Sequence, residues 1–327
     1  MKKRLYFKKC LMVGITGFLL IGLLAGAAFT AEKWPTRAIR IICPWAAGGG
    51  TDRISRKLAE VGQKYFGVPI IVENRIGGTG AVGHTYGAKA KPDGYVVTHI
   101  TFELVSAPAM GLAKVTYKDF EPIIRINVDP DAISVRSDAP WKTLDDLIKE
   151  AKEKPGVITM ANSGPGTCWH IGACRLEQAA GVKFVHVPFD GAFQEIQALI
   201  GGHVAAISCS PAEVAPYIES GDLRCLAVLA EERTYLLPDV PTAIELGYPA
   251  LLGGTWRGLG VPKGTPKEIV DKLVDGFTKA WNDPEFQDFM KKQGFGLAYL
   301  GPEKWGKFLE SEHKAVGTVL KAVGLAK

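Results

Sequence analysis

The sequence predicts an α/β fold made of two lobes, each built on a mostly parallel sheet. Short apolar segments alternate with amphipathic ones along the chain, which is typical of strands connected by helices. A strand followed by a glycine-rich loop and a helix occurs twice, in residues 38–65 and again in residues 157–180. Residues 32–327 are enough for two lobes of roughly 100–150 residues each.

The individual elements follow the period of the apolar residues. Strands are expected at 38–43, 68–72, 95–100, 120–127, 132–135, 157–161, 184–188, 204–208 and 224–229. Helices are expected at 52–65, 79–90, 143–154, 169–180, 196–200 and 212–219. In the helix at 143–154, Leu144, Leu147, Ile148 and Ala151 share one face, which we expect to point inward.

Two segments are expected to cross between the lobes as hinge strands, at 132–136 and 255–261. The C-terminal helices, at 266–281, 283–292 and 302–323, then return to the first lobe. Lobe one therefore comprises residues 32–131 and 257–327, and lobe two residues 132–256.

The N-terminal segment, residues 1–31, has the pattern of a secretory signal peptide. A basic stretch at 2–9 precedes an apolar run from Leu11 to Phe29, and small residues place the cleavage after Ala28 or Ala31. An uncleaved membrane anchor is the alternative, because the apolar run is close to spanning length. Cys10 precedes the apolar run, which argues against a lipoprotein. We therefore predict an exported protein.

The basic excess of the chain belongs to this segment. Residues 1–31 hold five of the 39 Lys and Arg and none of the 34 Asp and Glu, so residues 32–327 carry 34 charges of each sign. A balanced charge gives no support for nucleic-acid binding. An anionic ligand would have to be held by local geometry rather than by a global field.

The first glycine loop follows the strand at 38–43. Gly48, Gly49 and Gly50 relax the backbone, and Thr51 or Asp52 is expected to cap the helix that follows. Such a turn directs free N–H groups outward at the positive end of a helix, which suits an anion. The alternative is an ordinary strand-to-helix turn that needs glycine for its geometry.

The second loop, Ser163 to Thr167, has the same position after a strand and before a helix. Its hydroxyl and N–H groups are suited to hold a carboxylate from the opposite lobe. The alternative is an ordinary capping turn. The segments 189–191 and 208–210 also follow strand ends, where the ligands of open α/β sheets collect.

Other motifs support neither a cofactor nor catalysis. Residues 78–83 satisfy G-x-G-x-x-G, but five residues separate this motif from its strand, so we predict no dinucleotide and keep Gly78 and Thr79 as an anion contact. His170 and Cys174 lie four apart on one helix face without a second histidine or carboxylate at matching spacing, so no metal is predicted. No hydrolase motif occurs. The cysteines after residue 31 are odd in number and are interpreted as mostly buried apolar residues.

The order and spacing of several segments resemble the periplasmic substrate-binding receptors of tripartite tricarboxylate transporters, the Bug family. The matching segments are 34–52, 68–83, 91–95, 163–170, 182–192, 199–205, 216–228, 237–247 and 261–273. The resemblance implies a type II periplasmic-binding-protein (Venus-flytrap) fold whose cleft closes on a carboxylate-bearing small molecule. It implies that one carboxylate lies between residues 47–51 and 163–167, and that the liganded monomer meets membrane permease subunits.

Two residues depart from the family pattern. Asp190 stands where many relatives carry a basic or small residue, and it would repel a second ligand carboxylate or attract an amino group. Arg257 replaces an apolar residue and would pair with a distal carboxylate if it faces the cleft; a solvent-facing charge is the alternative.

The candidate ligand-binding residues combine both loops, apolar walls and these two charges. They are Trp45, Ala47, Gly48, Gly49, Gly50, Thr51, Asp52, Gly78, Thr79, Phe102, Ser163, Gly164, Gly166, Thr167, His170, Phe189, Asp190, Ser208 and Arg257. No catalytic residue is predicted. The alternative functions are a sensory module that docks on a membrane histidine kinase and, least favoured, a periplasmic enzyme.

Overall fold

The computed structural model describes residues 34–249, 251–322 and 324–326. The predicted signal peptide, residues 1–31, lies outside them. Residues Arg37–Lys327 form one unit by their contacts, and the architecture below is that of this unit. Within the described residues, no helix combines the length and apolarity required to cross a bilayer.

One group of strands, here called sheet A, contains the first glycine loop. It consists of β1 (Ile39–Cys43), β2 (Ile70–Asn74), β3 (Val96–Thr101), β9 (Gly254–Pro262), β10 (Leu297–Leu300) and the first part of β4 (Phe120–Arg136). Strand β1 pairs in parallel with β2 and β3, whereas β9 runs antiparallel to β3 and β4, and β10 antiparallel to β4. The β1 side chains are buried on both faces except at Arg40, as expected for an apolar central strand.

The second group, sheet B, contains the second loop. It consists of β5 (Thr159–Asn162), β6 (Val185–Pro188), β7 (Ala206–Cys209), β8 (Leu223–Leu229) and the second part of β4. Strand β5 is parallel to β6 and β7, and β4 is antiparallel to β7 and β8. The predicted parallel pairing is found between β1 and its neighbours β2 and β3 and between β5 and its neighbours β6 and β7. Each sheet is nevertheless mixed, because β9 in sheet A and β4 in sheet B pair antiparallel with their neighbours.

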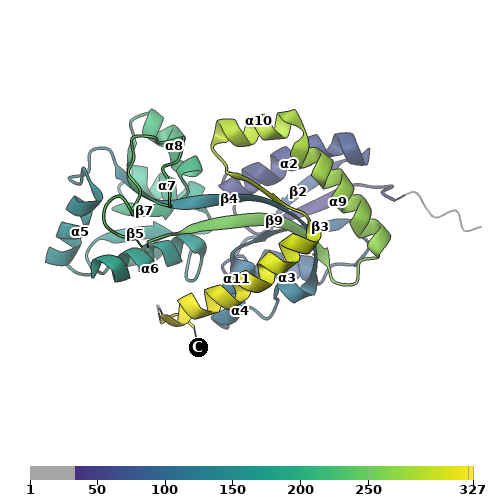
Figure 1. Cartoon of the computed structure of the whole chain (residues 1–327), viewed down its shortest axis with the longest axis horizontal. Coiled ribbons are helices and arrows are strands. Elements are labelled where there is room, and N and C mark those ends of the chain that lie inside the picture. The colour runs from purple at the N-terminus through teal and green to yellow at the C-terminus, as the bar shows by residue number, and fades with distance from the viewer. Residues whose placement is uncertain (1–33, 250, 323, 327) are drawn as a thin grey trace, which may run out of the picture. The chain divides into compact units, whose positions relative to one another are not determined.

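Strand β4 is continuous, although the sequence predicted two short strands at 120–127 and 132–135. Pro130 lies in the gap between these two predicted strands, but the chain remains extended there. The register of β4 shifts against β9 near Pro122 and Arg125 and against β8 near Ile133. Residues 120–130 pair with β9 in sheet A, and residues 131–136 pair in sheet B. Figure 1 shows β4 and β9 side by side between the two sets of helices. The lobe boundaries given above remain a proposal.

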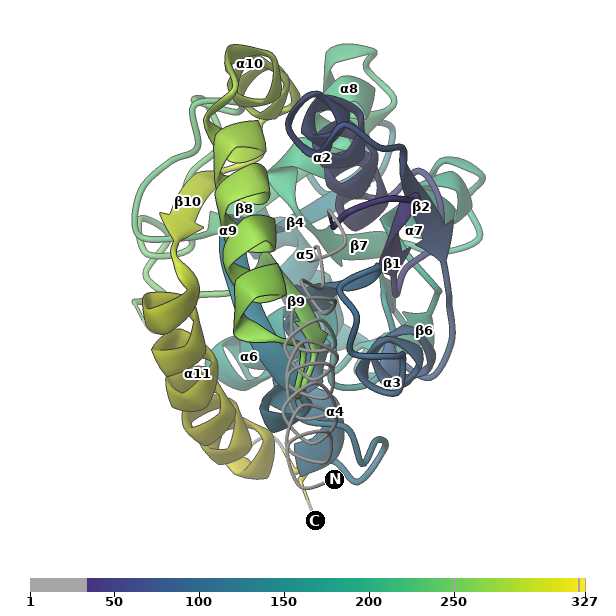
Figure 2. The same ribbon diagram turned by 90° about the vertical axis from the view of Figure 1, so that its right-hand side faces the viewer.

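Helices cover both sheets. On sheet A they are α2 (Gly50–Phe66), α3 (Ala81–Ala88), α4 (Glu103–Ala109), α9 (Lys267–Asn282), α10 (Pro284–Gln293) and α11 (Pro302–Ala322); α9 and α11 both pack on β4 (Figure 2). On sheet B they are α5 (Leu144–Glu153), α6 (Cys168–Ala180), α7 (Ala192–Ile200) and α8 (Pro211–Glu219). The predicted inward face of α5 is confirmed, since its four apolar residues are at most 4% exposed. The sequence analysis missed α4 and β10.

The core extends through both sheets. Trp305 of α11 is fully buried, packs edge-on against Trp256 of β9 and donates a hydrogen bond to the Leu259 carbonyl (3.2 Å). This contact requires Gly258, because a Cβ there would lie 2.5 Å from the Ile124 carbonyl oxygen and 2.6 Å from the Trp305 ring. The crossing strand β9 is thereby fixed against the C-terminal helix.

We expect G258A to lower the free energy of unfolding by about 1–3 kcal/mol, because the added methyl group overpacks this contact. Gly317 in α11 is the matched control: a Cβ there meets nothing within 4 Å, and alanine favours the helix by up to about 1 kcal/mol. Urea unfolding followed by circular dichroism measures both. Equal midpoints for G258A and the wild type would contradict the packing described.

Candidate functional site

The first loop joins β1 to α2. Gly48 has φ +88°, which favours glycine, and α2 begins at Gly50 with Gly49 as its N-cap. The prediction that Thr51 or Asp52 caps this helix is therefore wrong. Asp52 instead accepts the Gly48 N–H (2.9 Å), and the Thr51 hydroxyl accepts a hydrogen bond from Nε of Arg257 (2.9 Å). The helix start is shaped by contacts from outside the loop.

The second loop is held mostly by its own residues. Thr167 caps α6 by accepting the His170 N–H (3.2 Å), so the capping role left open by the sequence is present. Gly164 and Gly166 adopt φ +101° and +75°. Gly166 donates its N–H to Nδ1 of His170 (3.1 Å). The conformation of the loop is thus set by hydrogen bonds to its own residues and to the first turn of α6.

Both loops reach one small cavity of about 30 Å³. Six of the predicted site residues line it: Trp45, Gly49, Gly50, Thr51, Ser163 and Arg257. Residues that the sequence analysis did not name complete the lining: Thr101, Glu103, Cys168, Trp169, Gly191, Ala192, Glu213 and Thr255. The cavity has room for little more than one water molecule.

The remaining candidates lie around this cavity or away from it. Gly48 lines an adjoining cavity of about 270 Å³, and Phe102 lines another of about 320 Å³. Thr79 lies next to the second loop, near Gly164. The other candidates, Ala47, Asp52, Gly78, Gly164, Gly166, Thr167, His170, Phe189, Asp190 and Ser208, line none of the three.

Asp190 and Ser208 illustrate how side chains at strand ends can face elsewhere. Asp190 is exposed, so it does not place its charge in the cavity. The Ser208 hydroxyl is buried and lies within hydrogen-bonding distance of both the Asp131 carboxylate and the Trp169 carbonyl. Position after a strand placed these residues near the site but did not determine their orientation.

Arg257 is 3% exposed, so the solvent-facing alternative for this residue is wrong. Its guanidinium forms an ion pair with the Asp129 carboxylate (2.5 Å) in addition to its bond to Thr51. Asp129 also accepts hydrogen bonds from Asn127 Nδ2 and Gly296 N, both at 2.8 Å. Burial lowers the pKa of Arg257, but the Asp129 carboxylate more than offsets this, so the pKa lies above its ordinary value.

Three buried glutamates were missed by the sequence analysis. Glu213 accepts the Gly50 N–H (2.6 Å), Glu103 accepts the Cys168 N–H (3.3 Å), and Glu195 accepts the Ser163 hydroxyl (2.5 Å). Burial raises the pKa of Glu103, and that of Glu195 well above its ordinary range. The available signal was position, since Glu103 follows β3 and Glu213 stands in the first turn of the helix after β7.

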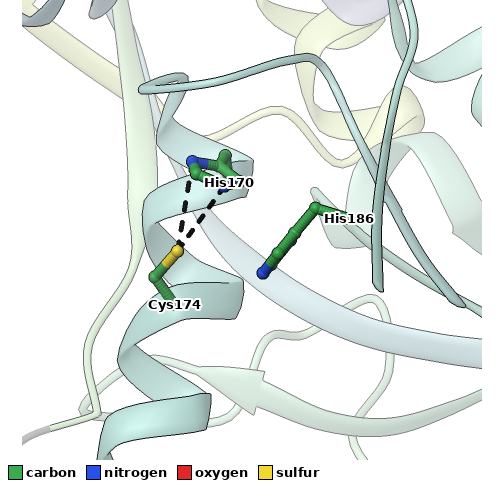
Figure 3. Close-up of side chains that lie close together, drawn as sticks. All are labelled: His170, Cys174 and His186. Carbon is green, nitrogen blue, oxygen red and sulfur yellow. Dashed lines mark hydrogen bonds between the residues drawn. The ribbon is translucent and has the colours of Figure 1, made fainter. Parts of the chain in front are cut away.

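A histidine pair lies beside the second loop (Figure 3). The sequence analysis found no second histidine at metal-binding spacing, but the fold brings His186 of β6 next to His170 and Cys174 of α6. The possible ligand atoms of all three lie within 4.8 Å of one another. The ring centroids of the two histidines are 4.6 Å apart.

The hydrogen bonds of this cluster set the tautomers of His170 and His186, and these tautomers do not suit a metal ion. Gly166 N–H donates to Nδ1 of His170, and Asn162 Nδ2 donates to Nδ1 of His186 (3.0 Å). The Asn162 amide is oriented by Gly164 N–H, which donates to its Oδ1 (3.1 Å). With Nδ1 of each ring accepting a hydrogen bond, each ring carries its proton on Nε2, the atom a metal would need. The cluster therefore acts as a support for the loop.

The architecture is that of a two-lobed periplasmic binding protein, and similarity to known proteins identifies the family. The model of the tripartite tricarboxylate transporter family receptor matches residues 54–325. The chain therefore belongs to the receptor family of tripartite tricarboxylate transporters, which includes the Bug proteins.

Individual relatives agree with this family. A UPF0065 protein in the gbd 5' region of Cupriavidus necator is 34% identical, over 91% of this chain and 90% of the relative. The periplasmic binding protein BugD is 32% identical over 90% of this chain and all of its own, with a TM-score of 0.86. MatC from Rhodopseudomonas palustris, solved with bound malate, is 28% identical over 88% of this chain and all of its own, with a TM-score of 0.82.

We expect R257M to lower the free energy of unfolding by about 3–5 kcal/mol, because it leaves the buried Asp129 carboxylate without its partner. Combining it with D129N should recover part of the loss. The exposed pair Lys267–Asp271 provides the control, because an exposed ion pair contributes little to the free energy of unfolding and K267M should therefore change it only slightly. Chemical denaturation of the wild type, R257M, D129N and R257M/D129N forms the cycle, and K267M is measured beside it. Equal losses in R257M and K267M would contradict a buried pair.

His170 should remain neutral well below its ordinary pKa. Burial lowers this pKa from 6.5 to about 4, and nearby His186 adds to the effect. Between these values the unfolded chain binds a proton that the folded chain does not, so the contribution of His170 to stability falls as the pH falls from 6.5 towards 4. Proton–carbon NMR titration of the ring measures the pKa, with H170N identifying the signal. A midpoint near 6.5 would refute the buried, neutral ring.

Proposed function

We propose that this chain is a periplasmic receptor that captures a carboxylate-bearing small molecule between its lobes and delivers it to a tripartite tricarboxylate transporter permease. The observation that carries the proposal is the meeting of two helix starts, α2 of sheet A and α6 of sheet B, at one cavity. Family membership supports it, and so does the malate bound by MatC.

Capture requires the lobes to open, because a cavity of about 30 Å³ cannot admit an organic acid. Strand β4 is shared by both sheets, so bending near Pro130, where its pairing passes from one sheet to the other, would separate the two loops. Closure then removes water from the bound carboxylate and brings the polar groups of both lobes against it. No covalent step is involved.

Carboxylates should stabilise the folded protein. In a thermal-shift screen of mono-, di- and tricarboxylates, a ligand at 100 times its Kd adds about 2.7 kcal/mol to the free energy of unfolding. T51L should weaken calorimetric binding of any hit by about 1–3 kcal/mol, because it removes the hydroxyl that orients Arg257 at the cavity. T318L, on the exposed face of α11, serves as the control. If no acid shifts the melting temperature, the proposal fails.

Delivery is tested separately from binding. A strain lacking this chain should lose uptake of the labelled acid identified in the screen, and the wild-type chain should restore it. Normal uptake together with a lost transcriptional response would instead point to ligand sensing through a membrane histidine kinase.

A further inference from the structure

The helix starts that would hold a ligand carboxylate already hold carboxylates of the chain itself. Glu213 of α8, on sheet B, accepts the N–H of Gly50 at the start of α2 on sheet A. Glu103 of α4, on sheet A, accepts the N–H of Cys168 at the start of α6 on sheet B. The two glutamates cross in opposite directions between the sheets. Each occupies the favourable end of a helix dipole.

The cavity between them is rich in carboxyl groups. Both Glu103 and Glu213 line it, and its lining contains a single basic side chain, Arg257, which is already paired with Asp129. The Oε2 atom of Glu213 is buried and has no hydrogen-bond partner among the described residues. The Glu213 residue as a whole is 6% exposed. Buried acceptors without donors cost free energy, so this cavity favours a group that donates hydrogen bonds.

The adjoining cavity of about 270 Å³ contains a basic side chain as well as Glu213. It shares Gly49, Ala192 and Glu213 with the inner cavity and is also lined by Arg53. Arg53 forms no ion pair within 4 Å in the part of the chain that the structure describes, and its guanidinium lies 5.2 Å from the Phe295 ring. A free guanidinium is suited to a carboxylate, which it can hold by two hydrogen bonds.

We propose that Glu103 and Glu213 select a ligand that carries a protonated amine in addition to its carboxylate. The ammonium group occupies the inner cavity, whose volume of about 30 Å³ suits one small group, and donates to the free Oε2 of Glu213. The carboxylate lies in the adjoining cavity towards Arg53. This inference rests on the proposed function, because it assumes that a carboxylate-bearing ligand enters this cleft.

The proposal explains why the internal carboxylates need not leave. Glu213 keeps its Oε1 on Gly50 N–H while its Oε2 receives the ammonium group. A diacid without an amine would instead place a second carboxylate against the unpartnered Oε2 of Glu213, where two acceptors meet and no hydrogen bond forms. Specificity then comes from repelling diacids as well as from attracting amines.

The test compares acids that differ only by an amino group. Isothermal titration calorimetry of the mature chain at pH 7 uses butyrate against 4-aminobutyrate, succinate against aspartate, and glutarate against glutamate. We expect the amine-bearing member of at least one pair to bind at least tenfold more tightly. E213Q and E103Q should reduce this preference about tenfold, whereas R53Q should weaken both members of the pair alike. E310Q, on the exposed face of α11, is the control.

The outcomes separate the two proposals. Two results would overturn the role of the glutamates but leave a carboxylate receptor intact. One is tighter binding of the amine-free acid in every pair, and the other is an unchanged preference of E213Q for the amine-bearing acid. If none of the six acids binds, with or without an amino group, the proposed function itself fails. Should E103Q or E213Q fail to fold, as judged by its melting transition, the comparison of the pairs on the wild-type chain still decides the ligand class.

Discussion

The buried ion pair between Arg257 and Asp129 is the contact on which the geometry of the site depends. It joins β9 to β4, the strand shared by both sheets, and through the Thr51 hydroxyl it also fixes the first turn of α2. Removing two charges from water is costly, and the cost is offset only when the remaining hydrogen-bonding groups are satisfied. Here Asn127 and Gly296 complete the shell of Asp129. The pair therefore places the first loop relative to the crossing strands.

The two loops are built on different principles, and this bears on closure. The second loop is fixed by neighbours in sequence, through the Thr167 cap and the bonds from Gly166 to His170 and from Gly164 to Asn162. The first loop is fixed by Arg257 of β9 and, across the two sheets, by Glu213 of α8. Separating the sheets must break both the Glu213–Gly50 and the Glu103–Cys168 hydrogen bonds. Opening therefore frees both helix starts, whereas the second loop keeps the hydrogen bonds among its own residues.

Local signals explain how much of the fold could be predicted from the sequence. Alternating apolar periods and the glycine loops located most strands and helices, and caps such as Thr143 define their starts. The two strands predicted at 120–127 and 132–135 leave out Pro130, a residue type that is rare inside strands, whereas β4 is continuous and Pro130 lies where its pairing passes from sheet A to sheet B.

The site was less predictable, because its chemistry comes from residues distant in sequence. Glu213 lies 163 residues from Gly50, and Arg257 lies 128 residues from Asp129. His186 meets His170 only through the pairing of β5 with β6. The position of Asp190 after a strand predicted a place beside the cleft, but its side chain is exposed. Tertiary packing determines which way a side chain points, and therefore whether its charge can reach a ligand.

The balance of charge over residues 32–327 makes this orientation decisive. A chain with equal numbers of acidic and basic residues has no general field to draw in an anion, so recognition depends on the few charges that are buried. In the inner cavity the carboxyl groups are those of Glu213 and Glu103, which lie at the N-termini of α2 and α6. The guanidinium of Arg257 is already paired with Asp129. Helix starts that would otherwise suit an anion have thereby been converted, by Glu103 and Glu213, into acceptors. This arrangement underlies our proposal that a fold which holds malate in a relative selects, in this chain, a ligand with charges of both signs.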